Sequence, residues 1–257
     1  MTTILKAENL GITFGGLKAV SRFDLELHSG ELVGLIGPNG AGKTTVFNML
    51  TGVYAPTEGD IRLLGISTRK KRPDQLVQMG IARTFQNIRL FKQLTVLENV
   101  MTACNFQMRY SLLSSIFRLP SYWREEKAVR EKAVSILQVF DLDSDLDVKA
   151  DNLPYGQQRK LEIARALATD PKVLLLDEPA AGMNPTETNA LMLTINLIRE
   201  RFGTTILLIE HDMNLVLGIC HRIIVLDYGQ IIASGRPEEI VSNPRVIAAY
   251  LGDETVD

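Results

Sequence analysis

The chain of 257 residues lacks the features that mark secreted and membrane-spanning proteins. Its two cysteines, Cys104 and Cys220, lie far apart without metal-ligand spacing, so each is predicted to be a small buried side chain in a reducing compartment. No apolar run approaches the roughly 20 residues needed to cross a bilayer. The first eight residues show no charged region, apolar core or cleavage site of a signal peptide. If the protein serves a membrane, we expect it to act from the cytoplasm through partners.

The chain also lacks an excess of positive charge. Its net charge of -2 argues against broad attraction to nucleic acid. One dense basic run, Arg69 to Arg72, contains no interleaved aromatic residue, and it is interpreted either as a solvated loop or as a phosphate-binding patch. No internal repeat or low-complexity tract interrupts the sequence, which is long enough to bury a substantial core.

Hydrophobic patterning predicts strands and one helix in the first part of the chain. The predicted strands are Leu10 to Phe14, Phe23 to Leu27 and, after a turn at Ser29-Gly30, Glu31 to Ile36. The last of these contains the apolar run typical of a buried parallel strand. A helix is expected from Gly42 to about Leu50, ending near Gly52.

The pattern becomes helical between residues 88 and 170 and then alternates again. Helices are predicted near Val96–Met108, Trp123–Val139 and Gln157–Ala168, with Pro120 and Pro154 as breakers in loops. Strands at Val173 to Leu176 and Thr204 to Ile209 flank a helix from Pro185 to Arg201, and a hairpin turning at Tyr228-Gly229 spans Arg222 to Ser234. We therefore predict an α/β protein with a mostly parallel sheet, interrupted by a mainly helical insertion.

A glycine-rich segment follows the predicted buried strand. Its residues, Gly37-Pro38-Asn39-Gly40-Ala41-Gly42-Lys43-Thr44, fit the pattern G-x-x-x-x-G-K-[ST] of a phosphate-binding loop. The glycines let backbone N–H groups converge on phosphate oxygens, and the helix that follows adds its positive N-terminal end. Lys43 is predicted to neutralise the terminal phosphates and Thr44 to ligate Mg²⁺, with Thr45 beside it in the ATP site. The alternative is a glycine turn without a ligand.

Two carboxylates stand where a second predicted strand ends. Asp177 and Glu178 follow the apolar run Leu174 to Leu176, and ligand sites of open α/β sheets form at the carboxyl ends of strands. We expect Asp177 to hold the Mg²⁺ shell and Glu178 to orient and polarise the attacking water. Taken alone, both acids could be ordinary turn residues, but a phosphate loop earlier in the chain favours the catalytic interpretation.

Several further residues, in order, make the chain resemble the nucleotide-binding subunit of an ABC transporter over nearly its whole length. Phe14 stands where that family has an adenine-stacking aromatic. Gln86 matches the glutamine that meets Mg²⁺ and senses the membrane subunit, and His211 matches the histidine that contacts the γ-phosphate. The resemblance implies one ABC ATPase domain over 1–257. Its catalytic core, residues 1–87 and 171–257, would combine a P-loop NTPase core with an N-terminal antiparallel β subdomain, and residues 88–170 would form an inserted helical subdomain.

The family's LSGGQ signature is altered here. Leu153, Pro154, Tyr155, Gly156 and Gln157 occupy its place, with proline and tyrosine where serine and glycine are usual. In the family this segment closes over the γ-phosphate held by a second subunit, so these five residues are predicted to bind ATP in trans. Proline supplies neither a hydroxyl nor an N–H. We therefore expect either a weak half-site or a partner subunit that supplies a better one.

Within that family the chain looks most similar to the ATPases of branched-chain amino-acid importers. The similarity rests on segments such as 83–91, 161–165, 177–185 and 209–213, on the ending at 243–252, and on the long insert from Asn105 to Glu126. It implies a bacterial protein on the cytoplasmic face of the inner membrane. Its partners would be a second ABC ATPase subunit, related or identical to this one, two membrane permease subunits and a periplasmic or surface-anchored binding protein. Residues 86–98 would form the groove for a cytoplasmic helix of a permease.

Other functions with the same core are kept as alternatives. These are the ATPase of a urea or amide importer, a lipid-export ATPase, and a soluble ABC ATPase acting on ribosomes or DNA. The last usually has two cassettes or long coiled coils, whereas this chain has one cassette, no sustained heptads and no basic bias. A GTPase would require an Asn-Lys-x-Asp motif, which the sequence lacks.

Overall fold

The computed structural model describes residues 2–104 and 120–251, which fall into two compact units. The core unit comprises Met1–Arg83 and Lys172–Asp257, and the helical unit comprises Thr84–Pro171. Among the helices of the described residues, none combines the length and the hydropathy that a membrane-spanning segment requires.

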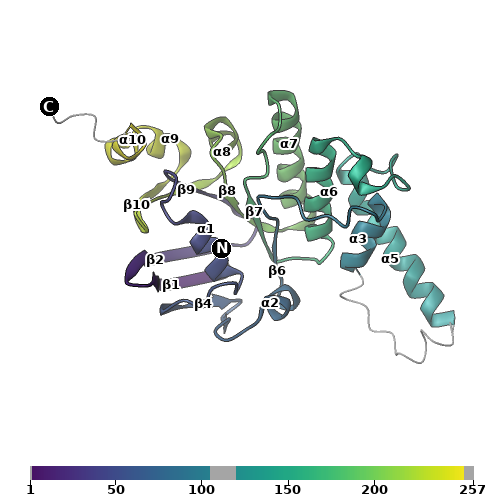
Figure 1. Ribbon diagram of the computed structural model, residues 1–257, viewed down its shortest axis with the longest axis horizontal. Helices are drawn as coiled ribbons and strands as arrows, with labels where there is room; N and C mark the ends of the chain where they lie inside the picture. The colour runs from purple at the N-terminus through teal and green to yellow at the C-terminus, as the bar shows by residue number, and fades with distance from the viewer. Residues whose placement is uncertain (1, 105–119, 252–257) are drawn as a thin grey trace. The chain divides into compact units, whose positions relative to one another are not determined.

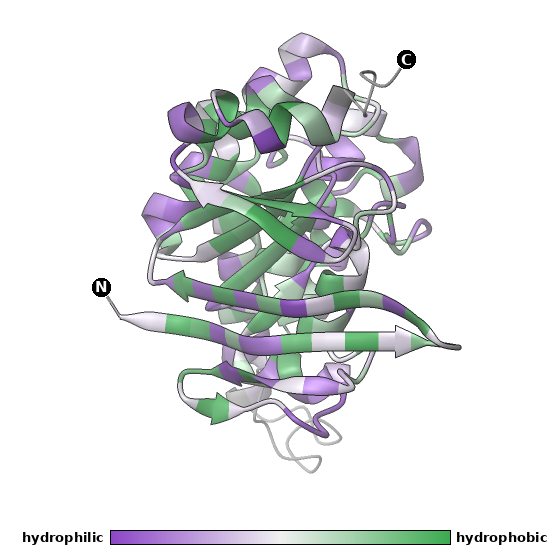
Figure 2. Ribbon diagram, turned by 90° about the vertical axis from the view of Figure 1, so that its left-hand side faces the viewer, coloured by the Kyte–Doolittle hydropathy of each residue, from purple (hydrophilic) through white to green (hydrophobic). Residues whose placement is uncertain are grey.

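The core unit begins with a four-stranded antiparallel sheet of order β2-β1-β4-β5. Its strands are β1 (Thr3–Phe14), β2 (Leu17–His28), β4 (Glu58–Leu63) and β5 (Ile66–Ser67). Hydrophobic and polar residues alternate along the two long strands, as Figure 2 shows, because one face packs on the core and the other meets solvent. Both long strands extend well beyond the short segments predicted from the sequence, across register shifts that break strict alternation.

The second sheet has six strands in the order β10-β9-β3-β8-β7-β6. They are β3 (Leu32–Ile36), β6 (Ile81–Arg83), β7 (Val173–Asp177), β8 (Thr205–Ile209), β9 (Arg222–Asp227) and β10 (Gln230–Gly235). All neighbouring pairs are parallel except β9 and β10, which form the hairpin predicted at Tyr228-Gly229. Every residue of β3, β7 and β8 is buried. Burial on both faces explains the continuous apolar runs from which these strands were predicted.

Helices cover both faces of the six-stranded sheet. They are α1 (Lys43–Leu50), α2 (Pro73–Met79), α7 (Pro185–Phe202), α8 (Met213–Ile219), α9 (Pro237–Val241) and α10 (Pro244–Leu251). Figure 1 shows α1 between the two sheets, with α7 and α8 on the opposite face of the larger sheet. Phe47 of α1 is fully buried in a cluster that joins residues of both sheets. The main core therefore lies directly beneath the segment that connects β3 to α1.

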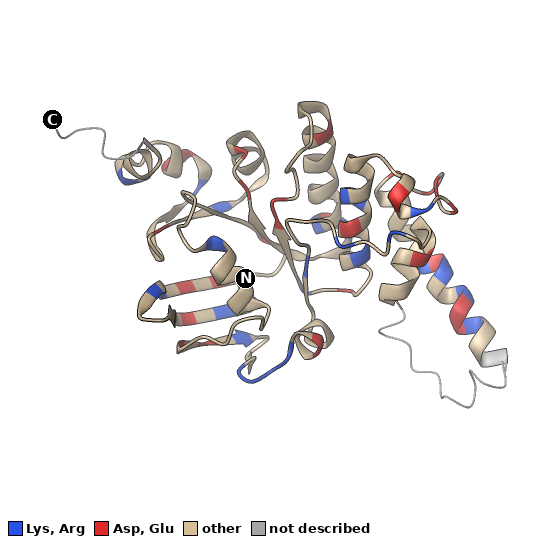
Figure 3. Cartoon of the chain, in the orientation of Figure 1, with Lys and Arg blue, Asp and Glu red and all other residues tan. Residues whose placement is uncertain are grey.

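The helical unit is built from α3 (Val96–Cys104), α5 (Pro120–Val139), α6 (Tyr155–Leu167) and a short 3₁₀ turn at Ala150–Asn152. Helix α3 packs against both α5 and α6. Charges of both signs lie along α5, as Figure 3 shows, which is typical of a solvated helix.

The predicted α/β class with a mostly parallel sheet is confirmed. Pro120 does not interrupt a loop as predicted; it begins α5, because proline is tolerated in the first helical turn, where no backbone N–H is needed. The helix predicted over Val96–Met108 is described as far as Cys104, and most of the insert from Asn105 to Glu126 lies outside the described residues. Strands β4 to β6 and helices α2 and α8 to α10 were not predicted.

Candidate nucleotide site

The phosphate loop runs from the end of β3 into α1 and adopts a conformation that requires glycine. Gly37 has a φ of 149°, and a side chain there would place its Cβ 1.9 Å from the carbonyl oxygen of Leu226. Gly42 has a φ of 103° and stands just before the first turn of α1. That turn carries Thr44, which is exposed, and Thr45, which is half-buried. The loop is thus fixed by close approach to β9, with the N-terminus of α1 pointing out of it.

Lys43 folds back over this loop. Its Nζ donates hydrogen bonds to the carbonyl oxygens of Gly37 at 2.7 Å and Pro38 at 2.9 Å. Burial lowers the pKa of Lys43, and the charges of Glu178 and Asp177 oppose that shift. An ammonium group has three hydrogens, so two fix the side chain and the third can meet a phosphate oxygen.

Glu178 and His211, both predicted as catalytic residues, are in direct contact. His211 Nε2 lies 3.0 Å from Glu178 Oε1. Glu178 directly follows β7 and has a φ of 48°, which is the left-handed region that side chains rarely adopt. Its N–H donates to the carbonyl of Ile209, the last residue of β8, at 2.9 Å. Adjacent strand ends therefore bring together two residues that are 33 positions apart.

A second carboxylate holds the backbone around this pair. Glu210 is 4% exposed and accepts hydrogen bonds from the N–H groups of Ala180 at 2.7 Å and His211 at 3.0 Å. Burial raises the pKa of Glu210, and these backbone donors partly oppose the rise. Glu210 thereby ties the loop after Glu178 to the loop that carries His211. The role of Glu210 was not predicted, although a carboxylate directly after an apolar strand is a usable signal.

The loop after Glu178 ends where α7 begins. Asn184 and Glu187 form a capping box, each side chain accepting the other's backbone N–H at 3.0 Å, and Pro185 occupies the first helical turn. These are strong helix-start signals, so the position of the loop relative to α7 is set locally.

Asp177, the last residue of β7, is paired with an arginine. Its Oδ2 lies 2.6 Å from Arg83 at the end of β6, and both side chains are almost fully buried. Arg83 also donates to Asn48 of α1 at 2.6 Å. Arg83 thus links the predicted metal carboxylate to the helix behind the phosphate loop. This pairing was not predicted, because its partners are 94 positions apart.

The donor set fits a magnesium ion that keeps part of its water shell. Among the residues that the structure describes, no group of three or more His, Cys, Asp or Glu side chains could enclose a metal. Mg²⁺ usually binds through one or two protein oxygens together with water and substrate phosphates. The Thr44 hydroxyl and the Asp177 carboxylate, both in the core unit, are suitable donors of that kind.

Phe14, predicted to stack on adenine, ends β1 and is 44% exposed. Its ring meets that of Tyr54 edge-on, with centroids 5.3 Å apart. A partly exposed aromatic ring of this kind is suited to stacking on a base.

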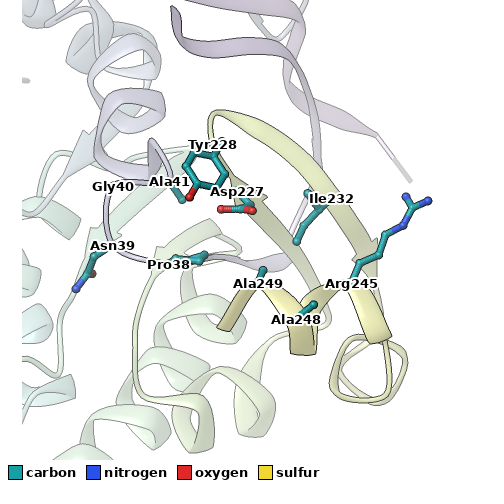
Figure 4. Close-up of a pocket in the computed structure, with 10 residues that line it drawn as sticks. All are labelled: Pro38, Asn39, Gly40, Ala41, Asp227, Tyr228, Ile232, Arg245, Ala248 and Ala249. Atoms are coloured by element: carbon teal, nitrogen blue, oxygen red, sulfur yellow. The ribbon is translucent and has the colours of Figure 1, made fainter. Parts of the chain in front are cut away.

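A cavity of about 540 Å³ borders the phosphate loop in the core unit. Figure 4 shows it between Pro38 to Ala41, the β9–β10 turn at Asp227-Tyr228, and Ala248 and Ala249 of α10. The C-terminal helix reaches this loop, and burial raises the pKa of Tyr250 in that helix, an effect that the nearby backbone of Gly37 partly offsets.

The remaining predicted site residues belong to the helical unit. Gln86 is exposed in the segment before α3. In the altered signature, Leu153 is buried, and Pro154 is the N-cap of α6 with an extended backbone. Helix geometry leaves the N–H groups of its first turn, including those of Gly156 and Gln157, without intrahelical acceptors. Pro154 therefore removes a donor just outside the helix, while the N–H groups that could face an anion remain.

Comparison with known proteins gives a consistent assignment. Residues 20–181 match the family model of ABC transporters, and residues 230–256 match that of branched-chain amino acid ATP-binding cassette transporters. The chain is 48% identical to the high-affinity branched-chain amino acid transport ATP-binding protein LivG of Escherichia coli, covering 97% of this chain and 98% of that one.

Comparison with solved structures supports the same family assignment. The ADP conformation of MJ1267, an ATP-binding cassette of an ABC transporter, has a TM-score of 0.85 at 36% identity and covers 98% of this chain and 100% of its own. A dimeric post-hydrolysis state of the cassette MJ0796, bound to ADP and phosphate, has a TM-score of 0.76 at 27% identity, covering 91% and 99%. The chain therefore belongs to the ABC transporter family as an ATP-hydrolysing, nucleotide-binding cassette, related most evidently to those of branched-chain amino-acid transport systems.

Proposed function

We propose that this cassette hydrolyses ATP to drive the uptake of leucine, isoleucine and valine into a bacterial cell. The observation that carries the proposal is the 48% identity to LivG over almost the whole of both chains, supported by the separate match of residues 230–256 to the branched-chain family. The residues at the site do not touch the transported solute, so the solute class follows from this kinship and not from site chemistry.

Within the core unit, the proposed chemistry has clear roles. Lys43 and the backbone N–H groups from Gly37 to Thr45 hold the phosphates, and Phe14 stacks on the adenine. Glu178 accepts the proton of the attacking water, and His211, hydrogen-bonded to it at 3.0 Å, fixes the carboxylate and contacts the γ-phosphate. Thr44 and Asp177 would hold Mg²⁺, which when bound would supply positive charge next to the phosphates.

The helical unit has the recognition roles in this proposal. Gln86 would reach the bound metal and sense the membrane subunit, and the segment from Leu153 to Gln157 would bind the nucleotide of a second cassette. Gln86, Arg89 and Phe91 are all exposed, as a docking surface for a permease helix requires. We assign residues 1–87 and 171–257 to the catalytic core subdomain and 88–170 to the helical subdomain. The compact units of the structure divide between Arg83 and Thr84 instead, so Gln86 lies in the helical unit although the proposed core subdomain includes it.

The proposed complex contains a second ABC ATPase subunit, related or identical, two permease subunits and a binding protein outside the cell. The cassette would lie on the cytoplasmic face of the inner membrane. Crosslinkers placed at Arg89 or Phe91 should reach a permease subunit. Their failure to do so, with crosslinks from a core residue as a control, would count against the docking surface.

The decisive experiment is to purify the chain with the products of its neighbouring genes in membranes and measure ATPase activity with different solutes. Stimulation by leucine, isoleucine or valine is the expected result. Stimulation by urea or amides alone would replace the branched-chain assignment, and a gene neighbourhood without a binding protein would favour lipid export.

A further inference from the structure

Arg159 is the largest fully buried side chain among the described residues, although arginine is rarely buried. It lies in the second turn of α6, four residues after the altered signature position Tyr155. Burying a guanidinium is costly unless its donors are satisfied. The hydrogen-bond acceptors of Arg159 therefore identify the segments that this side chain holds in place.

The two terminal nitrogens of Arg159 use all four of their hydrogens within the helical unit. Nη1 donates to the carbonyl oxygen of Phe85 at 2.8 Å and to Glu162 at 3.0 Å. Nη2 donates to the carbonyl oxygen of Gln86 at 2.6 Å and to the hydroxyl of Tyr155 at 3.3 Å. One side chain thus binds two consecutive carbonyls of the Gln86 segment and the tyrosine that departs from the usual signature.

Glu162 extends this link to the other end of the same segment. It is 2% exposed, pairs with Arg159 through Oε2, and accepts the N–H of Arg89 through Oε1 at 3.0 Å. The Arg89 guanidinium in turn lies 4.0 Å from the centroid of the Phe85 ring. The segment from Phe85 to Arg89 is therefore fastened to α6 at both ends by one buried ion pair.

We propose that Arg159, together with Glu162, is a positioning residue that couples Gln86 to the signature segment. The fork of Arg159 holds the Gln86 backbone to the N-terminal part of α6, so a displacement of either is imposed on the other. Tyr155 adds a bond to this fork that the usual glycine could not make. The altered signature thus strengthens the coupling while it removes a phosphate ligand. This inference rests on the proposed sensing role of Gln86.

The test uses the whole transporter in membranes and two variants that avoid an unpaired buried charge. Arg159→Lys keeps the positive charge but not the planar fork, and Arg159→Met/Glu162→Gln neutralises both partners. We expect the ratio of solute-stimulated to basal ATPase to fall by about 5-fold or more, the lower end of usual coupling strengths. Amide hydrogen exchange at residues 86–89 should quicken by about 10-fold or more, because the fastened segment opens locally.

Lys160→Met is the matched control. Lys160 lies on the same helix, but its ammonium donates to the carbonyl of Phe140 at 3.3 Å and makes no bond to the Gln86 segment. This variant should keep the parent's ratio of solute-stimulated to basal ATPase and the parent's amide hydrogen-exchange rate at residues 86–89. The proposal would be overturned if both Arg159 variants kept the parent's ATPase ratio and the parent's hydrogen-exchange rate at residues 86–89 while melting at the parent temperature.

Gln86→Ala separates this inference from the proposed function. If Gln86→Ala leaves the stimulation ratio unchanged, the sensing role of Gln86 fails, and hydrogen exchange alone then decides whether Arg159 positions the segment. If Gln86→Ala removes stimulation while the Arg159 variants do not, only the coupling proposal fails.

Discussion

The Nε2 atom of His211 lies 3.0 Å from Oε1 of Glu178, and this contact joins the ends of two adjacent parallel strands. Glu178 is held there by its left-handed backbone and by its N–H bond to Ile209. The carboxylate therefore has a fixed direction before any nucleotide arrives, as a preorganised base requires.

Replacing this carboxylate should stop hydrolysis without preventing binding. Because general-base catalysis contributes about 10²- to 10⁴-fold, Glu178→Gln should lower the ATPase rate by at least roughly 10²-fold. Nucleotide affinity, measured by titration with a fluorescent ATP analogue, should stay near that of the parent. Hydrolysis at the parent rate would show that Glu178 is not the base.

The buried pair of Arg83 and Asp177 should be important for stability as well as for the site. Removing one partner of a buried ion pair leaves an uncompensated charge and costs about 3–5 kcal/mol. We therefore expect Arg83→Ala to lower the free energy of unfolding by that amount in a urea titration. Arg62→Ala is the control, because Arg62 pairs with Asp60 at 3.1 Å while 53% exposed. An exposed pair contributes about 0–1 kcal/mol. Equal losses in the two variants would contradict the interpretation.

Replacing Pro154 with the serine that is usual in the signature tests how far the proline weakens this half-site. The extended backbone of Pro154, with φ at -54° and ψ at 151°, is one that an N-cap serine can adopt. Pro154→Ser regains a hydroxyl and an N–H. A hydrogen bond to a charged group contributes about 1.5–3 kcal/mol, so ATPase activity or nucleotide-dependent dimer closure should rise. If neither rises, the half-site is not limited by Pro154.

Acid should weaken the core unit partly through Glu31. Burial raises the pKa of Glu31, but hydrogen bonds from Arg222 and from the His28 backbone more than reverse this, so its pKa in the folded protein is below the ordinary value of 4.5. A depressed pKa stabilises the fold above the unfolded pKa, and that contribution is lost as the pH falls through the folded pKa. Glu31→Gln should melt below the parent at pH 7, and the difference should shrink below about pH 4.5.

The control for this pH dependence is Glu8→Gln. Glu8 pairs with Lys6 at 2.9 Å, but both side chains are nearly half exposed. Its melting temperature should follow that of the parent at every pH. A constant gap between Glu31→Gln and the parent from pH 7 to pH 3 would contradict the linkage.

Local patterns explain which features could be predicted from the sequence. The phosphate loop, β7 and β8 were predictable because their glycines and apolar runs are contiguous. Strand β6 has only three residues, and the β4 sequence Glu-Gly-Asp-Ile-Arg-Leu contains residues that disfavour strands, so neither gave a periodic signal. Their pairing with strands far along the chain supplies the missing stability.

The partners of buried charges were the least predictable part. Arg83 and Arg159 carry no signal that distinguishes them from solvated residues, because charged side chains are usually exposed. Their roles depend on which distant carbonyls and carboxylates the fold places around them. Arg83 lies close to Gln86, one of the residues that carry the family resemblance. Nothing near Arg83 in the sequence indicated that it pairs with Asp177.

Because α10 lines the cavity beside the phosphate loop, a probe on this C-terminal helix can report on the loop. A fluorophore on the exposed Arg245 position would sit in α10, at the rim of the cavity beside the phosphate loop. Its emission could then follow occupancy of the loop without any label on a residue that handles ATP. Conversely, a bulky fusion joined close behind Tyr250 would risk disturbing nucleotide affinity, so affinity tags are better attached at the other end.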